Sequence, residues 1–351
     1  MFIFGRNRFD DPGAEFWKWW PSARDRVARS IVTGTYDNRL IGEITKHVHR
    51  VHREMAWELQ PGTAAAHAFC LSPEGDPERR QVALRWLESA PKPDATGEYH
   101  ASKPPAASLM SLQVAGSHFD LQAMRATASW DATRRLVDVG LWHPGFERVG
   151  DEVRMQAGFL FLDHLLGEDG VERWIGQIDL LETPPEGLAP AELKAMVEGH
   201  AAEPSTGAWQ VGEVRRPDGP PAIVAVDAGL KRIDHPFHDV HVWVRMLWGA
   251  ERHPTETESA QLEAEEDEFL RRMGDAAILA ARVTVPGMRI WHFVTRDFDA
   301  MKPAIDGWAA WLPDALSPGL PQRRLQIDGG GDMRWAFRQD LGNAGFGPLS
   351  R

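Results

Sequence analysis

The sequence is almost devoid of cysteine. Cys70 is the only one among 351 residues, so no disulfide can form within a single chain. It lies in the apolar run 67–71, where no histidine or arginine flanks it closely enough to lower its pKa. This setting predicts a buried, unreactive thiol in a protein of a reducing compartment.

Long hydrophobic runs are also missing. No stretch approaches the roughly 18 uncharged residues that a membrane-spanning helix needs. The apolar part of segment 1–6 is too short for a secretory signal peptide. We therefore expect a cytoplasmic protein that has no membrane partner.

Basic charge is scarce. The chain carries 39 Lys and Arg against 51 Asp and Glu, a formal net charge of −12. Proteins that follow a phosphate backbone rely on clustered Lys and Arg, whose binding releases counterions. Nucleic acid is therefore not the expected partner.

Familiar catalytic motifs do not occur. The sequence contains no nucleotide-binding glycine loop, no Gly-x-Ser-x-Gly elbow and no paired-cysteine metal site. The glycine run 329–331 follows a predicted strand but opens no helix, which indicates a turn and not a phosphate site. The sequence thus predicts no cofactor, no metal and no catalytic residue, and it favours a non-catalytic protein.

Tryptophan, in contrast, is abundant. Fifteen Trp stand against two Tyr, in a composition that is otherwise typical of a globular protein, with 43% apolar and 26% charged residues. Because an indole ring brings a large apolar area and one hydrogen-bond donor, many of these rings should lie in cores or at domain interfaces. An exposed Trp would instead indicate a recognition surface.

The length suits two domains, each able to bury its own core. A shift to Pro, Gly and Ser between them predicts a linker that contains a β-hairpin. Within the N-terminal domain, three alternating runs in 109–142 predict an antiparallel meander. The predicted parts are a tail over 1–14, an N-terminal α+β domain over 15–203, the linker over 204–236, a C-terminal domain over 237–340 and a tail over 341–351.

The C-terminal domain shows the clearest pattern, and the fold class is α+β. Residues 240–246 alternate between apolar side chains and those of His241, Trp243 and Arg245, as expected of a half-buried strand. A capping box at Thr255-Glu256-Thr257-Glu258 opens a helix, and Pro286-Gly287 joins two further strands. With a second helix and a closing strand, this order predicts a ferredoxin-like βαββαβ sandwich. The N-terminal domain should be a mixed antiparallel sheet with helices.

Four motifs and one strand carry a resemblance to a known family. They are Phe16-Trp17-Lys18-Trp19-Trp20, Trp57-Glu58-Leu59-Gln60-Pro61-Gly62, Phe161-Leu162-Asp163-His164-Leu165-Leu166-Gly167-Glu168, Leu262-Glu263-Ala264-Glu265-Glu266-Asp267 and the strand 289–294. With them the chain resembles bacterial proteins of the domain-of-unknown-function family numbered 695, whose C-terminal part is similar to the ribonuclease E protein regulator. The resemblance implies a bacterial protein with a ferredoxin-like C-terminal part. It implies no activity and transfers no catalytic residue.

The densest group of potential metal ligands is His235, His238 and His241, with Asp234 and Asp239 among them. Zinc needs imidazole and carboxylate groups that converge on one point. On a strand, however, residues an odd number apart face opposite sides, so His238 and His241 would diverge. The group is either a metal site of a hydrolase or a set of histidines at the entry to a strand.

Asp163 interrupts the apolar run 159–166 and is the best candidate for a functional carboxylate, because buried carboxylates with shifted pKa values mark many active sites. The alternative is that Asp163 lies on the solvated side of its helix. The acidic run 263–268 reads mostly as a solvated helix face, with Glu266 alone near the inner stripe.

Trp243 and Trp291 lie on two strands that should be central in the C-terminal sheet, where RNA-recognition domains stack bases on aromatic rings. The basic consensus of those domains is missing, so single-stranded RNA is an alternative and another protein is the expected partner. The proposed binding residues are Trp243, His241, Trp291 and Asp163. The sequence assigns no oligomeric state.

Overall fold

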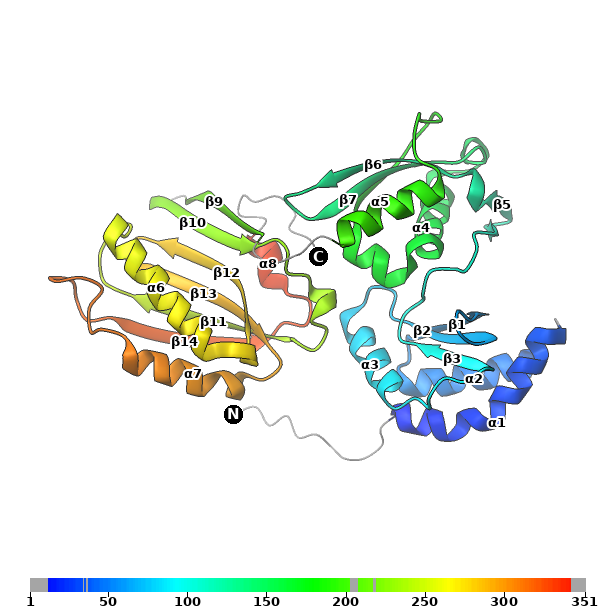
Figure 1. Ribbon diagram of the computed structural model, residues 1–351, viewed down its shortest axis with the longest axis horizontal. Helices are drawn as coiled ribbons and strands as arrows, with labels where there is room; N and C mark the ends of the chain where they lie inside the picture. Colours follow the sequence, from blue (N-terminus) through cyan, green and yellow to red (C-terminus); the bar gives the residue numbers. More distant parts are fainter. Residues whose placement is uncertain (1–11, 34, 36, 203–207, 217–218, 342–351) are drawn as a thin grey trace. The chain divides into compact units, whose positions relative to one another are not determined.

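The computed structural model describes residues 12–33, 35, 37–202, 208–216 and 219–341 (Figure 1). Most of the two expected tails, 1–11 and 342–351, lies outside the described residues. The protein is of mixed α+β class: 41% of the described residues are helical and 29% lie in strands, which form several sheets. It divides into two compact units: unit 1 comprises 1–129 and 137–202, and unit 2 comprises 130–136 and 203–351.

The first part of unit 1 packs three helices against a small sheet. Strand β2 lies between β1 and β3, antiparallel to the first and parallel to the second. The elements are α1 (Pro12–Thr33), α2 (Asn38–Val51), β1 (Ala56–Pro61), β2 (His67–Ser72), α3 (Pro77–Glu88) and β3 (Gly97–His100). Helix α1 runs through Pro21 and remains one helix to Thr33.

The core of this part is aromatic. The rings of Trp17 and Trp86 stack with centroids 4.5 Å apart, and Trp17 Nε1 donates to the Trp86 carbonyl at 2.7 Å. Trp20 Nε1 donates to the Tyr99 hydroxyl at 3.0 Å. The indoles of Trp17 and Trp20 thus find acceptors inside the core, whereas Nε1 of Trp86 has no partner among the described residues. The expectation that many tryptophans are core residues is confirmed.

The second part of unit 1 is built around a long helix. Its elements are β4 (Ser111–Val114), β5 (Ser117–Asp120), β6 (Arg125–Asp131), β7 (Leu136–Trp142), α4 (Asp151–Trp174), β8 (Ile175–Leu180) and α5 (Pro190–Ala201). The meander expected over 109–142 is wrong: β4 pairs with β5 in a separate hairpin, and the three-stranded sheet has the order β6-β7-β8. Strand β8 is parallel to β7 because α4 carries the chain back to the same end of the sheet.

Unit 2 is dominated by one six-stranded sheet. Its elements are β9 (Trp209–Arg216), β10 (Gly219–Asp227), β11 (Val240–Leu247), α6 (Glu256–Met273), β12 (Ile278–Val285), β13 (Met288–Thr295), α7 (Phe298–Trp311), β14 (Arg324–Gly331) and α8 (Ala336–Leu341). Short 3-10 turns occur in both units. Those of unit 1 are Leu121–Ala123 and Phe146–Arg148, and those of unit 2 are Arg232–Asp234 and Gly274–Ala276. No helix within the described ranges is long and apolar enough to cross a membrane.

The strand order in this sheet is β14-β11-β13-β12-β10-β9, and the five neighbouring pairs are antiparallel. The segment 204–236, expected as a linker, supplies β9 and β10 and so extends the sheet of unit 2. Pro217 and Asp218, in the turn of that hairpin, lie outside the described residues. After β14 the chain forms helix α8, whose first amides donate to the carboxylate of Asp332.

Helices α6 and α7 cover one face of this sheet (Figure 1). Along β11 the side chains of Val242, Val244 and Met246 are fully buried against them, and the side chains between them point to the second face. The core adds Trp291 and Phe293 from β13. The alternation predicted for 240–246 is confirmed.

The acidic run 263–268 on helix α6 is less solvated than expected. Glu265 is buried and makes a bidentate ion pair with Arg323, both contacts 2.8 Å long. Glu266 accepts from Trp291 Nε1 at 2.6 Å and from Arg282 at 2.5 Å. The inward position of Glu266 is confirmed, but a solvated Glu265 is wrong, because a cation from beyond the helix reaches it.

Removing one partner of the buried Glu265–Arg323 pair should destabilise unit 2 strongly. Glu265→Ala and Arg323→Ala each leave an uncompensated buried charge, which costs about 3–5 kcal/mol. Replacing both residues by Leu should recover much of this loss. Urea unfolding measures it, and Arg271→Ala, which removes an exposed ion pair on the same helix, is the control and should leave the midpoint almost unchanged. Single variants as stable as this control would contradict the assignment.

Candidate functional site

Helix α4 is interrupted in its middle. Gly167 has φ 75° and ψ 160°, a conformation that disfavours any side chain. A Cβ at this position would lie 2.7 Å from Pro105 Cδ and 3.0 Å from the Lys103 carbonyl oxygen. The backbone of 103–106 crosses the break, where Glu168 N donates to the Lys103 carbonyl at 2.9 Å. The helix resumes directly after this break and continues to Trp174.

This break places Glu168 in the interior of unit 1. Its side chain is 8% exposed, and Oε2 accepts from Ser72 Oγ at 3.0 Å and from Lys103 N at 3.3 Å. Its other oxygen, Oε1, is buried and has no hydrogen-bond partner among the described residues. Burial raises the pKa of Glu168 above its ordinary range, against the lowering effect of these hydrogen bonds.

Asp163 lies on α4 one turn before the break and is partly buried, so it is not on the solvated side of its helix. Burial raises the pKa of Asp163 to about 6. The Lys103 ammonium opposes this shift, whereas the carboxylates of Glu168 and Glu58 add to it. Lys103 Nζ is 3.1 Å from Glu58 Oε1, so its charge is shared among several carboxylates. Asp163 can therefore exchange a proton close to neutral pH.

The buried side chains near Asp163 and Glu168 have structural roles. Arg80 is buried and binds Asp169 at 2.6 Å and Glu172 at 2.5 Å, which fixes α3 to the last turns of α4. Cys70 is fully buried, and burial raises the pKa of its thiol to about 12. The expected burial of this thiol is confirmed.

In unit 2, Trp243 and its neighbours form a partly exposed patch on the second face of the sheet. The Arg245 guanidinium lies over the Trp243 ring, 4.6 Å from its centroid, and Arg245 donates to Gln326 Oε1 at 3.2 Å. Asp328 of β14 is directly opposite Trp243 in the strand register. We call Trp243, Arg245, Gln326 and Asp328 the Trp243 surface.

His241 lies on the same face, two residues before Trp243 on β11. Its Nε2 is 3.0 Å from Nδ1 of His292, and the ring of Phe337 lies parallel to it with centroids 4.0 Å apart. Burial lowers the pKa of both histidines, that of His292 to about 3. Both imidazoles are therefore neutral at physiological pH.

The three histidines considered as metal ligands, His235, His238 and His241, do not converge. The rings of His235 and His238 lie edge to face, 5.2 Å apart, whereas His241 points to His292. Within the part of the chain that the structure describes, no group of three His, Cys, Asp or Glu side chains could hold a metal ion. The metal-site hypothesis for these residues therefore finds no support in their geometry.

Trp291 is not on the same face as Trp243. It is opposite Val244 in the register, is fully buried and donates from Nε1 to Glu266. The hypothesis that Trp243 and Trp291 together stack bases is therefore wrong in its geometry. Alternation along each strand assigns every side chain to one of two faces. Whether Trp243 and Trp291 share a face depends on the register between β11 and β13, which cannot be read from the sequence.

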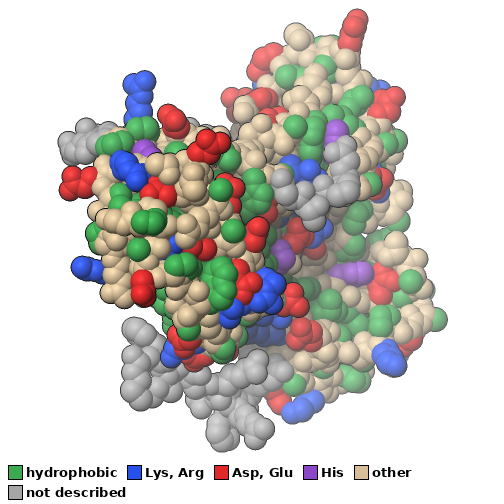
Figure 2. Space-filling model, turned by 60° about the vertical axis from the view of Figure 1, so that its left-hand side comes forward, with side chains coloured by type: hydrophobic (Ala, Val, Ile, Leu, Met, Phe, Trp, Pro, Cys, Tyr) green, Lys and Arg blue, Asp and Glu red, His purple; other side chains and the backbone are tan. Residues whose placement is uncertain are grey.

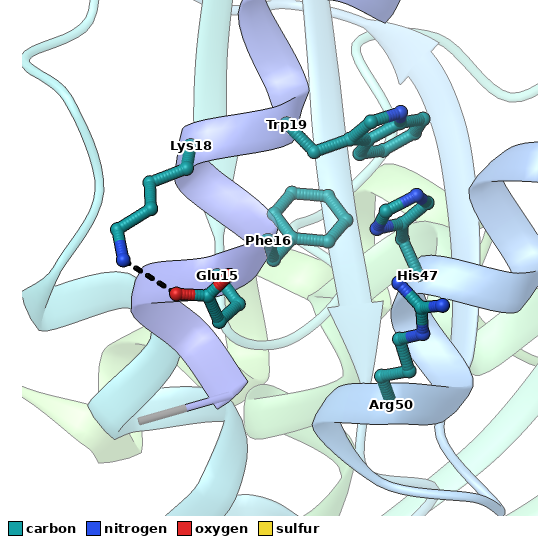
Figure 3. Close-up of a pocket in the computed structure, with 6 residues that line it drawn as sticks. All are labelled: Glu15, Phe16, Lys18, Trp19, His47 and Arg50. Atoms are coloured by element: carbon teal, nitrogen blue, oxygen red, sulfur yellow. Dashed lines mark hydrogen bonds and ion pairs between the residues drawn. The ribbon is translucent and has the colours of Figure 1, made fainter. Parts of the chain in front are cut away.

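A pocket of about 280 Å³ opens between α1 and α2 (Figure 3). The rings of Trp19 and His47 stack in it with centroids 3.9 Å apart, and Lys18 pairs with Glu15 at its rim. Burial, together with the charges of Arg50 and Lys46, lowers the pKa of His47. Sequence reasoning missed this pocket because its stacked rings, those of Trp19 and His47, come from different helices. It is lined by Glu15, Phe16, Lys18, Trp19, His47 and Arg50.

No protein-family model, curated protein or solved structure matches the chain. The resemblance to the bacterial family numbered 695 therefore stays a prediction.

Asp163 should make stability depend on pH in a way that Asp163→Asn removes. Because its folded pKa is raised to about 6 from 3.8, the native carboxyl keeps its proton while the unfolded one loses it. The free energy of unfolding should thus fall as the pH rises between these values. We expect Asp163→Asn to match the wild type near about pH 4 and to be more stable near about pH 7.5 in urea unfolding.

Glu152→Gln, an exposed substitution on the same helix, is the control and should show no such pH-dependent difference. A stability difference between Asp163→Asn and wild type that is equal at both pH values would contradict the raised pKa.

Proposed function

We propose that this chain is a non-catalytic bacterial protein of the cytoplasm that binds another protein, and that it docks through the Trp243 surface and the adjoining edge strand β14. The observation that carries the proposal is the partly exposed Trp243 with Arg245 stacked over it, beside an exposed sheet edge.

Tryptophan and arginine are the residue types most enriched among those that dominate binding energy at protein interfaces. The Arg245 guanidinium is held on the indole and by Gln326, so little conformational entropy is left to lose on binding. Asp328 supplies an exposed charge of opposite sign across the register. A partner thus meets a preorganised aromatic anchor with polar groups of both signs at its rim.

Strand β14 supports the proposal in a second way. It is the outermost strand at its end of the sheet and is exposed at all but one of its eight positions. An exposed edge strand offers unpaired backbone groups to an added strand. An extended segment of a partner can therefore pair with β14 while its side chains reach Trp243.

We also propose that β11, α6, β12, β13, α7 and β14 form a ferredoxin-like unit, to which β9 and β10 add a hairpin. The strand order β14-β11-β13-β12, its antiparallel pairing and the location of both helices on one face support this. The architecture hosts many activities, so the function rests on the Trp243 surface and not on the fold.

Charge and packing give nucleic acid less support. Acidic and basic side chains are interspersed over the face shown in Figure 2, without a continuous basic stripe among the coloured residues. Trp243 lies on the second face of the sheet, and Trp291 lies on the other face, so the two rings cannot stack successive bases. Single-stranded RNA binding of the usual kind combines a basic groove with successive stacking rings.

Trp243→Ala should reduce capture of a partner from the native cell lysate by at least about tenfold, as expected for loss of a central aromatic anchor. The matched control is Trp311→Ala, since Trp311 is 46% exposed on α7 and also lies near an arginine, with Arg272 6.0 Å from its centroid. Quantitative mass spectrometry of proteins bound to immobilised full-length chain measures both variants.

Equal capture by the two variants would contradict the docking surface. So would turnover of a hydrolase substrate by the purified wild type that is abolished in Asp163→Asn, because the protein would then be an enzyme.

A further inference from the structure

We infer that residues 332–341 of this chain cover the part of the second sheet face of unit 2 that adjoins the Trp243 surface, and that a partner must displace them to bind the whole of this face. We call this segment the C-terminal cover. The inference rests on the proposed function, because it concerns regulation of the same site.

The C-terminal cover lies against the second face of the unit 2 sheet through aromatic side chains. Phe337 stacks on His241 and, with centroids 5.7 Å apart, on His292. Trp335 is 3% exposed and donates from Nε1 to the His238 carbonyl at 2.7 Å. Beneath these rings lie the buried apolar side chains of Leu230, Ala280 and Val294.

The covered area is continuous with the Trp243 surface. His241 precedes Trp243 by two residues on β11, and His292 is directly opposite Trp243 on β13. Displacement of Phe337 would therefore extend the exposed surface from Trp243 along both central strands. The surface that a partner can contact is smaller while the C-terminal cover is in place.

The C-terminal cover is attached in a way that permits displacement. It follows the glycine run 329–331 at the end of β14, and α8 has only six residues. Helices this short are not stable alone in water, so α8 depends on its contacts with the sheet. The cover is not a strand of the sheet, so its removal leaves the strand pairing intact.

The contact also buries polar groups at a cost. Arg338 is 3% exposed and donates to the carbonyl oxygens of Leu230 and Asp227, but its Nε has no partner among the described residues. Burial lowers the pKa of Arg338 to about 10. His238 Nδ1 is likewise buried without a partner. Unsatisfied buried donors and acceptors weaken a contact, so this cover binds less firmly than an apolar one of the same size.

The covered surface indicates the kind of segment that can replace the cover. It accommodates two aromatic rings spaced two residues apart and a guanidinium beside backbone carbonyls, as in Trp335-Ala336-Phe337-Arg338. A partner segment with the same arrangement of aromatic and basic side chains would compete for it.

A peptide with the sequence of 332–341 tests the inference in trans. We expect the fluorescently labelled peptide to bind full-length Phe337→Ala at least about tenfold more tightly than wild type, because the variant's own cover no longer competes well. Phe298→Ala, which removes a partly buried ring from the core on the opposite sheet face, is the matched control and should bind the peptide like wild type. Equal peptide affinity in all three proteins would overturn the inference.

Native-state hydrogen exchange of the wild type gives a second test that does not depend on a variant. The amides of Phe337 and Arg338, which bond to Asp332 and Trp335, should exchange through a local opening, with protection at least about tenfold below that of β11 and β13. Exchange of these amides only on global unfolding would make the segment a permanent part of the core. Neither test needs a partner, so a Trp243→Ala protein that keeps its partner would refute the proposed function and leave the cover standing.

Discussion

The architecture of unit 2 depends on the two-residue alternation along β11. This strand lies between β14 and β13, so each of its side chains is committed to one of two faces. Val242, Val244 and Met246 close the core beneath α6 and α7. The alternate positions must then carry His241, Trp243 and Arg245 to the other face, and a shift of one residue would exchange the two sets. The core and the docking surface are thus two consequences of one register.

Local signals in the sequence made many of the helices, strands and turns predictable. The capping box at Thr255 and the Pro286-Gly287 turn act within a few residues, and the structure has helix α6 and the β12–β13 hairpin at these places. Helix α4 breaks at Gly167, where φ is positive and a Cβ would lie too close to Lys103 and Pro105, so only glycine fits. Mixed α+β class follows from such local elements alone.

The candidate site was less predictable because it depends on contacts between distant segments. Trp291 is turned into the core by its register with Val244, and Glu265 is buried because Arg323, 58 residues away in the sequence, neutralises it. His241 finds His292 and not His235 or His238. In each case the side chain was visible in the sequence and its partner was not. Asp163 was recognised as unusual because an apolar run surrounds it, which is a local signal for burial.

The central claim is that the second face of the unit 2 sheet is where another protein binds. Photo-crosslinking in living cells tests it most directly, with a photoreactive residue in place of Asp328, opposite Trp243, or of the exposed Asp306 on α7 as the matched position. The account predicts one discrete protein adduct at position 328 and none at 306. Equal labelling at the two positions, or an adduct at 328 that ribonuclease removes, would contradict it.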